Sequence, residues 1–304
     1  MKKIFLNADW IFVNEIPKGT CNSYFDYKTE FEVEKIKNIK LYISASALYA
    51  VYVNGAFVDC GQYADYEEYQ VYDELDIAKF VKQGKNTLEI MQYVIGSDVF
   101  THRKQIPGVI FTIWQEDECL LNSNEDVLSR KNMQYTSGEM EYVTPQLGFV
   151  FKYDSCAKDA VYQKSVLAGK EKHLIERPIK KLIIEEDTIG TLKTQGVYCT
   201  DGRLKTIGKL MQETYLSTRA EGELLYRDNE SITWHMDDED MAEGVYFVLD
   251  AGQESVGFLN LDIEVPKECD VLIGYGEHLE DLRVRTSIKK RNFAVSYHAH
   301  AGRN

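Results

Sequence analysis

Short segments of alternating apolar and polar residues recur along the chain, with turn-forming residues between them. Segments at roughly 8–12-residue spacing are typical of sandwich folds that are built from short strands. The segments that we interpret as strands are IKLYISAS (39–46), AVYVNG (50–55), AFVDCG (56–61), NTLEIMQYV (86–94), GVIFTIWQ (108–115), GVYFVLDAG (244–252), GFLNLDIEV (257–265), DVLIGYGE (270–277) and NFAVSYHAH (292–300). The pattern therefore predicts an all-β protein.

The segment ALYAVYVNGAFVDCG, residues 47–61, consists of two apolar runs joined by Asn54 and Gly55. Asn-Gly is the preferred pair of a two-residue type I′ turn, because both positions need a positive φ. The first strand would be largely apolar on both faces, with Tyr49, Val51 and Val53 on one and Ala50 and Tyr52 on the other. We therefore predict a hairpin inside a packed sandwich, with a scaffold role.

Helical signals are few. A short helical turn is predicted after Asp76, followed by a turn at residues 84–86 and then a strand. Residues 207–221 place Leu210, Met211, Tyr215 and Thr218 near one face, which predicts a helix over that range. The charged stretch 168–187 contains Pro178 and separates two strand-rich blocks. We therefore predict two domains, 1–176 and 177–304.

Charge limits the class of partner. The chain has 304 residues, with 35 basic against 49 acidic side chains and a net charge of −14. Nucleic acid and anionic membrane surfaces are poor partners for such a protein. The longest uninterrupted apolar run, residues 47–53, is far shorter than the ~20 residues of a transmembrane helix.

Cysteine usage and the amino-terminal sequence bear on the compartment. The six cysteines form no C-x-x-C pair and lie at wide intervals, at Cys21, Cys60, Cys119, Cys156, Cys199 and Cys269. We interpret them as buried, reduced thiols. Asn7 and Asp9 interrupt the first apolar stretch before it reaches the length of a signal peptide. A soluble, cytoplasmic protein without a cofactor is expected.

Two long segments carry a resemblance to a known family. LYAVYVNGAFVDCG followed by YDELDIAKFVKQGKNTLEI (72–90) resembles the galactose-binding-like jelly roll found beside the catalytic domains of many glycosidases. Residues 245–304 look like the β-sandwich that precedes the catalytic barrel in bacterial α-L-rhamnosidases and their relatives. RPIKKL (177–182) resembles the joint between two such sandwiches, so the resemblance covers nearly the whole chain.

The resemblance implies two β-sandwiches, the first a galactose-binding-like jelly roll and the second a concanavalin-like sandwich that lacks its last strand or strands. In such enzymes a six-hairpin α/α barrel follows and holds the catalytic carboxylates. The chain would then be the non-catalytic N-terminal region of a glycoside hydrolase, with its own missing catalytic domain as partner. The alternative is a free-standing carbohydrate-binding module that binds a plant or bacterial saccharide.

Carboxylates that could serve catalysis are Asp250, Glu254 and Glu277. Inverting glycoside hydrolysis needs two carboxyl groups about 6.5–9.5 Å apart, one protonated and one ionised. The resemblance makes all three sandwich residues, so we assign no catalytic residue here. Glu277 is interpreted as a turn anchor beside strand-end glycines, and it is also kept as a weak candidate for saccharide contact.

Two further patterns are weighed as metal sites. His298 and His300 alternate with Ala299 and would share one face of a strand, but two ligands do not make a zinc site. The acidic run 236–244 lacks the register of a calcium-binding loop. We predict half-exposed histidines and a solvated loop, and no metal.

The best binding candidate is GQYADYEEYQVYDE, residues 61–74. Sugar recognition needs aromatic faces for stacking and polar groups for hydroxyls. The segment offers both, in Tyr63, Tyr66, Tyr69 and Tyr72 with Gln62, Glu67, Glu68 and Gln70. Tyrosines at a contact between domains would give the same pattern, and we favour that interpretation over carbohydrate binding, with Tyr63, Tyr66 and Tyr69 as the candidate binding residues.

Overall fold

The computed structural model describes residues 4–14, 20–66, 68–169, 173–185, 191–203, 205–218, 225–227, 232–234 and 242–304. The chain divides into two compact units, of which the first comprises Met1–Met140 and Pro145–Lys180 and the second comprises Glu141–Thr144 and Lys181–Asn304. Each unit is described by itself. The division at Lys180 and Lys181 lies within the charged stretch 168–187.

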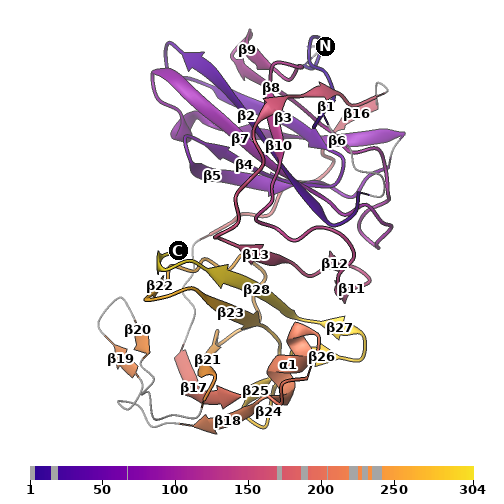
Figure 1. Ribbon diagram of the computed structural model, residues 1–304. Coiled ribbons are helices and arrows are strands. Elements are labelled where there is room, and N and C mark those ends of the chain that lie inside the picture. Colours follow the sequence, from indigo (N-terminus) through magenta and orange to yellow (C-terminus); the bar gives the residue numbers. More distant parts are fainter. Residues whose placement is uncertain are drawn as a thin grey trace. The chain divides into compact units, whose positions relative to one another are not determined.

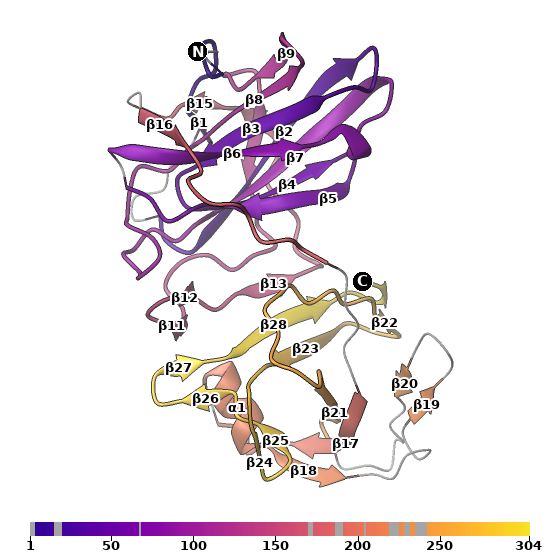
Figure 2. The same cartoon turned by 180° about the vertical axis from the view of Figure 1, so that it is seen from behind.

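The first unit is a β-sandwich of two sheets, seen from opposite sides in Figures 1 and 2. Among the described strands, seven form one sheet in the order β15-β1-β8-β3-β6-β16, with β9 beside β8. Their bounds are β1 Ile11–Phe12, β3 Ile39–Ala45, β6 Tyr69–Asp76, β8 Val109–Gln115, β9 Glu118–Asn122, β15 Val166–Leu167 and β16 His173–Glu176. All pairings in it are antiparallel except that of β16 with β6.

Six described strands form the second sheet, in the order β14-β10-β2-β7-β4-β5. Their bounds are β2 Ser23–Val33, β4 Leu48–Val53, β5 Ala56–Gly61, β7 Gly84–Val94, β10 Leu128–Lys131 and β14 Gln163–Lys164. The other elements of this unit are the 3₁₀ turn η1 Ala78–Phe80 and two short strands, β12 Gly148–Phe149 and β13 Lys152–Asp154. The predicted helical turn after Asp76 and the strand that follows are confirmed. The predicted turn at 84–86 is wrong, because β7 already begins at Gly84 and these residues pair with β2.

Alternation along the strands builds the core. β3 and β7 each bury every second residue, as expected for strands with one face on a core. Phe12, from the seven-stranded sheet, meets Phe25, from the six-stranded sheet, edge to face with ring centroids 4.8 Å apart. Such aromatic pairs add specific geometry to apolar burial. The all-β prediction is confirmed.

The hairpin of β4 and β5 has the predicted turn, because φ is +53° at Asn54 and +82° at Gly55. Its predicted environment is wrong in one respect. Tyr49, Val51 and Val53 are buried, but the opposite face of β4 is only partly covered. The reason is that each sheet of a two-sheet sandwich packs on the core with one face only, so the other face of β4 is directed away from the core.

The described part of the second unit consists of small sheets, hairpins and the helix α1, which contacts β23 and β28. β17 pairs with β18 and β21, β23 pairs with β28, and the remaining described pairs are β19–β20, β22–β29, β24–β25 and β26–β27. Their bounds are β11 Tyr142–Thr144, β17 Thr191–Cys199, α1 Ile207–Glu213, β18 Tyr215–Thr218, β19 Leu225–Arg227, β20 Ile232–Trp234, β21 Gly244–Asp250, β22 Glu264–Val265, β23 Cys269–Gly274, β24 Leu279–Glu280, β25 Arg283–Val284, β26 Ser287–Ile288, β27 Arg291–Asn292, β28 Ala294–Ala299 and β29 Gly302–Arg303.

Helix α1 is half as long as predicted. It ends at Glu213, and the hydroxyl of Thr214 donates to the carbonyl of Met211 at 3.0 Å. Such a side-chain bond competes with the helical ladder and favours a stop. Tyr215 then enters β18, opposite Cys199 of β17. The segment that was predicted as one helix therefore contains a helix followed by a strand.

The strand predicted at 257–265 is also largely wrong. Only its last two residues, Glu264 and Val265, are in a strand, where they pair with β29. Residues 251–262 are exposed, and alternation alone does not make a strand when no neighbouring strand pairs with it. The strands predicted at 244–252, 270–277 and 292–300 are present with shifted ends.

None of the six cysteines is in a disulfide, and the prediction that they are buried is wrong. Cys156 is exposed and the other five are partly exposed. In the part of the chain that the structure describes, no helix has the length and apolar character needed to span a bilayer.

Candidate functional site

The tyrosine-rich loop of the first unit, residues 61–72, leaves β5 and enters β6. Between the two strands the backbone N–H of Tyr66 donates to the carbonyl of Tyr69 at 3.3 Å, which closes a tight turn. The two rings lie 5.6 Å apart at a tilt of 53°, with the residues 50 % and 39 % exposed. This pair is the protruding aromatic feature of the loop.

The loop's polar residues are occupied with its own backbone. Oδ2 of Asp65, which is buried, accepts from Nε2 of Gln62 at 2.6 Å and from the N–H of Val71 at 3.0 Å. Gln62 also donates to the carbonyl of Val71 and accepts from the N–H of Ala45. These two side chains hold the loop closed, so they are not available for the hydroxyls of a sugar. Gln70 is fully buried and donates to Gln105, and Glu67 lies outside the described residues.

Tyr63 and Tyr72 do not join the exposed pair. Tyr72 packs edge to face on Phe5 and Tyr42, at 5.4 and 6.2 Å between ring centroids. Burial, followed by Glu176 and Glu74, raises the pKa of Tyr72. Tyr63 lies under the guanidinium of Arg177, whose Cζ is 5.2 Å from the ring centroid. The four tyrosines therefore do not share one surface.

A buried charged cluster lies at the end of this loop, and we call Tyr49, Asp73 and Arg177 the cross-sheet cluster. Asp73, on β6, has a side chain that is 1 % exposed. It accepts hydrogen bonds from the Tyr49 hydroxyl on β4 and from Nε and Nη2 of Arg177, the last at 3.0 Å. Tyr49 and Asp73 belong to different sheets, so the cluster joins the two layers of the sandwich.

Local packing makes room for the cluster. Gly61 lies opposite Tyr49 in the β4–β5 pair, and a Cβ at Gly61 would stand 2.6 Å from the tyrosine ring. Burial, followed by Asp73, raises the pKa of Tyr49 well above its usual value, so its hydroxyl stays protonated and donates. The hydrogen bond to Asp73 raises the pKa of Arg177. A bidentate guanidinium–carboxylate pair of this kind is strong and geometrically specific.

The cross-sheet cluster was not predicted from the sequence. Asp73 and Arg177 are 104 residues apart, so no local spacing connects them. Pro178 marks Arg177 as the last residue before a chain turn, and a charge within an otherwise alternating strand marks Asp73. Neither feature indicates that Asp73 and Arg177 pair with each other.

The three candidate catalytic carboxylates of the second unit have no environment that favours acid catalysis. Asp250 accepts from the N–H of Gly252 at 2.9 Å and faces Lys193 at 3.4 Å, and these contacts lower its pKa. Glu254 and Glu277 are exposed, and neither has a hydrogen bond with another described residue. Asp250 is thus the turn anchor in this set, whereas the interpretation of Glu277 as one finds no support in its contacts.

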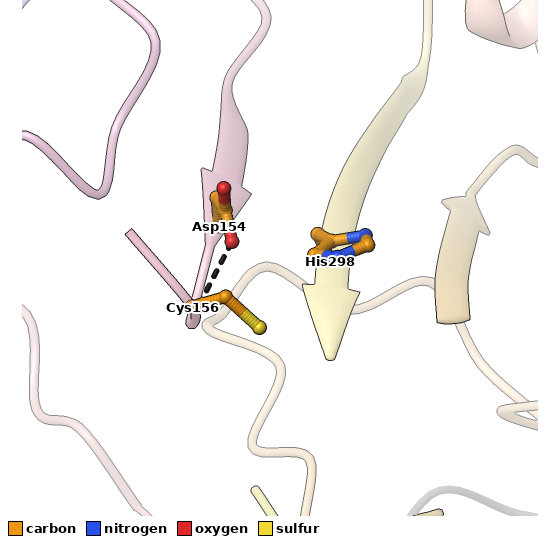
Figure 3. Close-up of side chains that lie close together, drawn as sticks. All are labelled: Asp154, Cys156 and His298. Carbon is orange, nitrogen blue, oxygen red and sulfur yellow. Dashed lines mark hydrogen bonds between the residues drawn. The ribbon is translucent and has the colours of Figure 1, made fainter. Parts of the chain in front are cut away.

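The histidines have separate surroundings. Nδ1 of His298 lies 2.7 Å from Oδ1 of Asp270, its cross-strand neighbour in β23. His300 lies past the end of β28, and its N–H donates to Asn304. Figure 3 shows His298 together with Asp154 and Cys156, where the Cys156 N–H donates to Asp154 at 2.8 Å. Asp154 and Cys156 belong to the first unit and His298 to the second, so we assign them no common site.

The acidic run at 236–244 lies mostly outside the described residues, since only 242–244 are described. The second unit also has a cavity of about 490 Å³, which the sequence did not predict. Its lining is polar throughout and is made of Lys209, Gln212, Glu213, Glu280, Asp281, Arg283, Ser287 and Lys289. No ring of a described residue lines it, so it lacks the stacking face that saccharide sites use.

Part of the first unit matches a known protein family. Residues 34–162 match the family described as the alpha-L-rhamnosidase N-terminal domain. No curated protein sequence matches the chain. Among solved structures, the GH78 family rhamnosidase of Bacillus sp. GL1 is similar with a TM-score of 0.66 and 13 % identity, over 98 % of this chain and 51 % of that one.

Two further rhamnosidase structures are similar at 15 % identity. That of Dictyoglomus thermophilum has a TM-score of 0.57 over 100 % of this chain and 32 % of its own. That of Aspergillus terreus has a TM-score of 0.58 over 97 % and 32 %. At such identities the similarity establishes the fold alone, and the chain spans between a third and a half of the length of these proteins. Residues 34–162 of the first unit therefore match the alpha-L-rhamnosidase N-terminal domain family, and the chain has a β-sandwich fold similar to that of these rhamnosidase structures.

Proposed function

We propose that this chain is the accessory N-terminal region of an α-L-rhamnosidase-like glycoside hydrolase and that it braces the catalytic barrel of the parent enzyme. The parent would hydrolyse terminal α-L-rhamnosides with inversion. The observation that carries the proposal is the family match over residues 34–162, together with the similarity in fold to α-L-rhamnosidases over nearly the whole chain.

The carboxylates of the second unit support a non-catalytic role. An inverting enzyme keeps one carboxyl group protonated at neutral pH, which requires a raised pKa. The contacts of Asp250 lower its pKa instead, and Glu254 and Glu277 are exposed. The catalytic acid and base of the proposed parent then lie in its barrel, and the sandwiches contribute rigidity.

The test compares the isolated chain with the full open reading frame of the parent gene, each assayed on an aryl α-L-rhamnoside. We expect no turnover above buffer from the isolated chain and measurable turnover with inverted product from the parent. Turnover by the isolated chain that disappears in Glu277→Gln, with folding retained, would overturn the accessory role. A parent that folds but cleaves other glycosides would overturn the substrate class.

The exposed pair Tyr66 and Tyr69 favours a second candidate, a free-standing carbohydrate-binding module. Two rings 5.6 Å apart and tilted offer faces on which the C–H surface of a sugar can stack. The engagement of Gln62 and Asp65 within the loop argues against this candidate, because it removes polar groups that a sugar would need. The accessory role therefore remains our proposal.

The proposed compartment and partners follow from composition. Six free thiols are consistent with a reducing cytoplasm, which we propose as the location. The net charge of −14 supports a protein partner, the catalytic domain, over nucleic acid.

A further inference from the structure

Strand β16, residues 173–176, is the last strand of the first unit and is weakly held by its own packing. It is four residues long, ends its sheet and pairs in parallel with β6, from His173 opposite Tyr69 to Glu176 opposite Tyr72. None of its residues is buried, and only Leu174 packs against the core cluster. Edge strands that are short and parallel gain little from backbone pairing, since water replaces those bonds when the strand leaves.

Arg177, the next residue, is less exposed than β16 and makes strong side-chain contacts. Its side chain is 16 % exposed, its guanidinium makes two bonds to Asp73, and its plane lies over the ring of Tyr63. Its backbone N–H also donates to the carbonyl of Tyr72 at 3.1 Å. The guanidinium covers Asp73, whose side chain is 1 % exposed at the junction of the two sheets, so its departure would break a charge-assisted pair and uncover a buried charge.

We propose that Arg177 is a latch that holds β16 and the chain leaving the first unit onto the sandwich. When Arg177 is in place, it balances the buried charge of Asp73. Because β16 directly precedes Arg177 in the chain, it then stays paired with β6. When it is removed, Tyr49 is the remaining donor of the cross-sheet cluster. Residues 173–180 then detach as a flexible linker, while the sandwich stays folded. The latch thus holds the chain on the first unit as far as Arg177.

Hydrogen exchange of the whole chain, followed by mass spectrometry, tests the latch. In Arg177→Ala we expect exchange of 69–72 and 173–176 to accelerate about 100-fold, which corresponds to about 2.8 kcal/mol at ~1.4 kcal/mol per factor of ten. Strands β2 and β7 should keep their protection. In Arg177→Lys, which lacks the bidentate fork, we expect an intermediate acceleration.

A matched control is Arg130→Ala. The side chain of Arg130 is 22 % exposed, pairs with Asp26 and Asp159, and has its Cζ 4.4 Å from the ring centroid of Tyr162. Arg130 is on β10 of the six-stranded sheet, whereas β16 ends the seven-stranded sheet. Arg130→Ala should leave exchange of 173–176 unchanged. If Arg177→Ala fails to fold, the variant Asp73→Asn/Arg177→Ala removes the buried charge together with its partner, and the same local acceleration is expected in it.

Three results would overturn the latch. Unchanged exchange of 173–176 would mean that backbone pairing holds β16. Equal acceleration in all strands would mean that Arg177 contributes only to global stability. Acceleration of 173–176 in Arg130→Ala to the same extent would mean that any buried charge in the sandwich has this effect.

Discussion

Nδ2 of Asn54, in the hairpin turn, donates to Oδ1 of Asn86, near the start of β7, at a distance of 2.8 Å. Asn54 also donates to the carbonyl of Phe80 and accepts from the N–H of Thr87. Asn86 accepts from the N–H of Lys82 and donates to the carbonyls of Lys82 and Gly84. The hairpin and the segment after η1 are therefore one hydrogen-bonded unit.

The first expectation concerns Asn86→Ala. Asn86 is 1 % exposed, and its removal leaves backbone groups of the 82–84 turn without their partners. We expect a loss of about 2–3 kcal/mol in the free energy of unfolding, measured in urea. The control is Asn124→Ala, where one bond to the N–H of Asp126 is lost at a partly exposed turn, with a loss below about 1 kcal/mol. Equal losses in the two variants would show that Asn86 is an ordinary turn residue.

The second expectation concerns Gly55→Val. A Cβ at Gly55 meets no atom within 4 Å, so the variant tests backbone strain alone at a φ of +82°. A β-branched residue in that conformation should lower the free energy of unfolding by about 1–3 kcal/mol, seen as a lower melting temperature. Gly257→Val is the control, because Gly257 has equal space and no positive φ. An unchanged melting temperature in Gly55→Val would contradict the type I′ turn.

The third expectation is a pH dependence at Asp250. The Gly252 N–H and Lys193 lower the pKa of this carboxyl in the folded protein. A lowered folded pKa stabilises the protein above the unfolded value of about 3.9, and this contribution disappears as the pH falls through the folded value. Asp250→Asn should therefore melt below the unaltered chain at pH 7, with the gap closing in acid. A gap that widens on acidification would mean that the pKa is raised, as a catalytic acid requires.

The fourth expectation concerns Tyr66 and Tyr69. Under the accessory role, Tyr66→Ala and Tyr69→Ala weaken folding or assembly with the catalytic domain, and titration with L-rhamnose or a plant oligosaccharide shifts no resonance of the unaltered chain. A binding module would instead show saturable shifts with millimolar affinity, about −4 kcal/mol. Tyr215→Ala, at an exposed ring of the second unit, is the control. Saturable shifts abolished by either loop variant but retained in the control would refute the accessory role.

Sequence patterns correctly predicted the elements that depend on residues close together in the chain. The Asn-Gly turn, the strands β3, β7 and β8 and the turn after Asp76 depend on residues close in sequence, and all are present. The strand at 257–265 failed because a strand also needs a neighbour, which the segment itself does not specify. The cross-sheet cluster was out of reach because its members come from three distant segments that only the folded sandwich brings together.

The outer strand of the hairpin has a consequence for solubility. β5 ends its sheet, and an open edge of that kind can template a strand from another molecule. The register of the β4–β5 pair shifts between Val51 and Tyr52, and the carboxylate of Asp59 accepts from the N–H of Cys60 at 2.7 Å. The irregular register twists the edge, and the carboxylate adds a charge while occupying one amide. We therefore expect these two features to disfavour edge-to-edge pairing of two chains at β5.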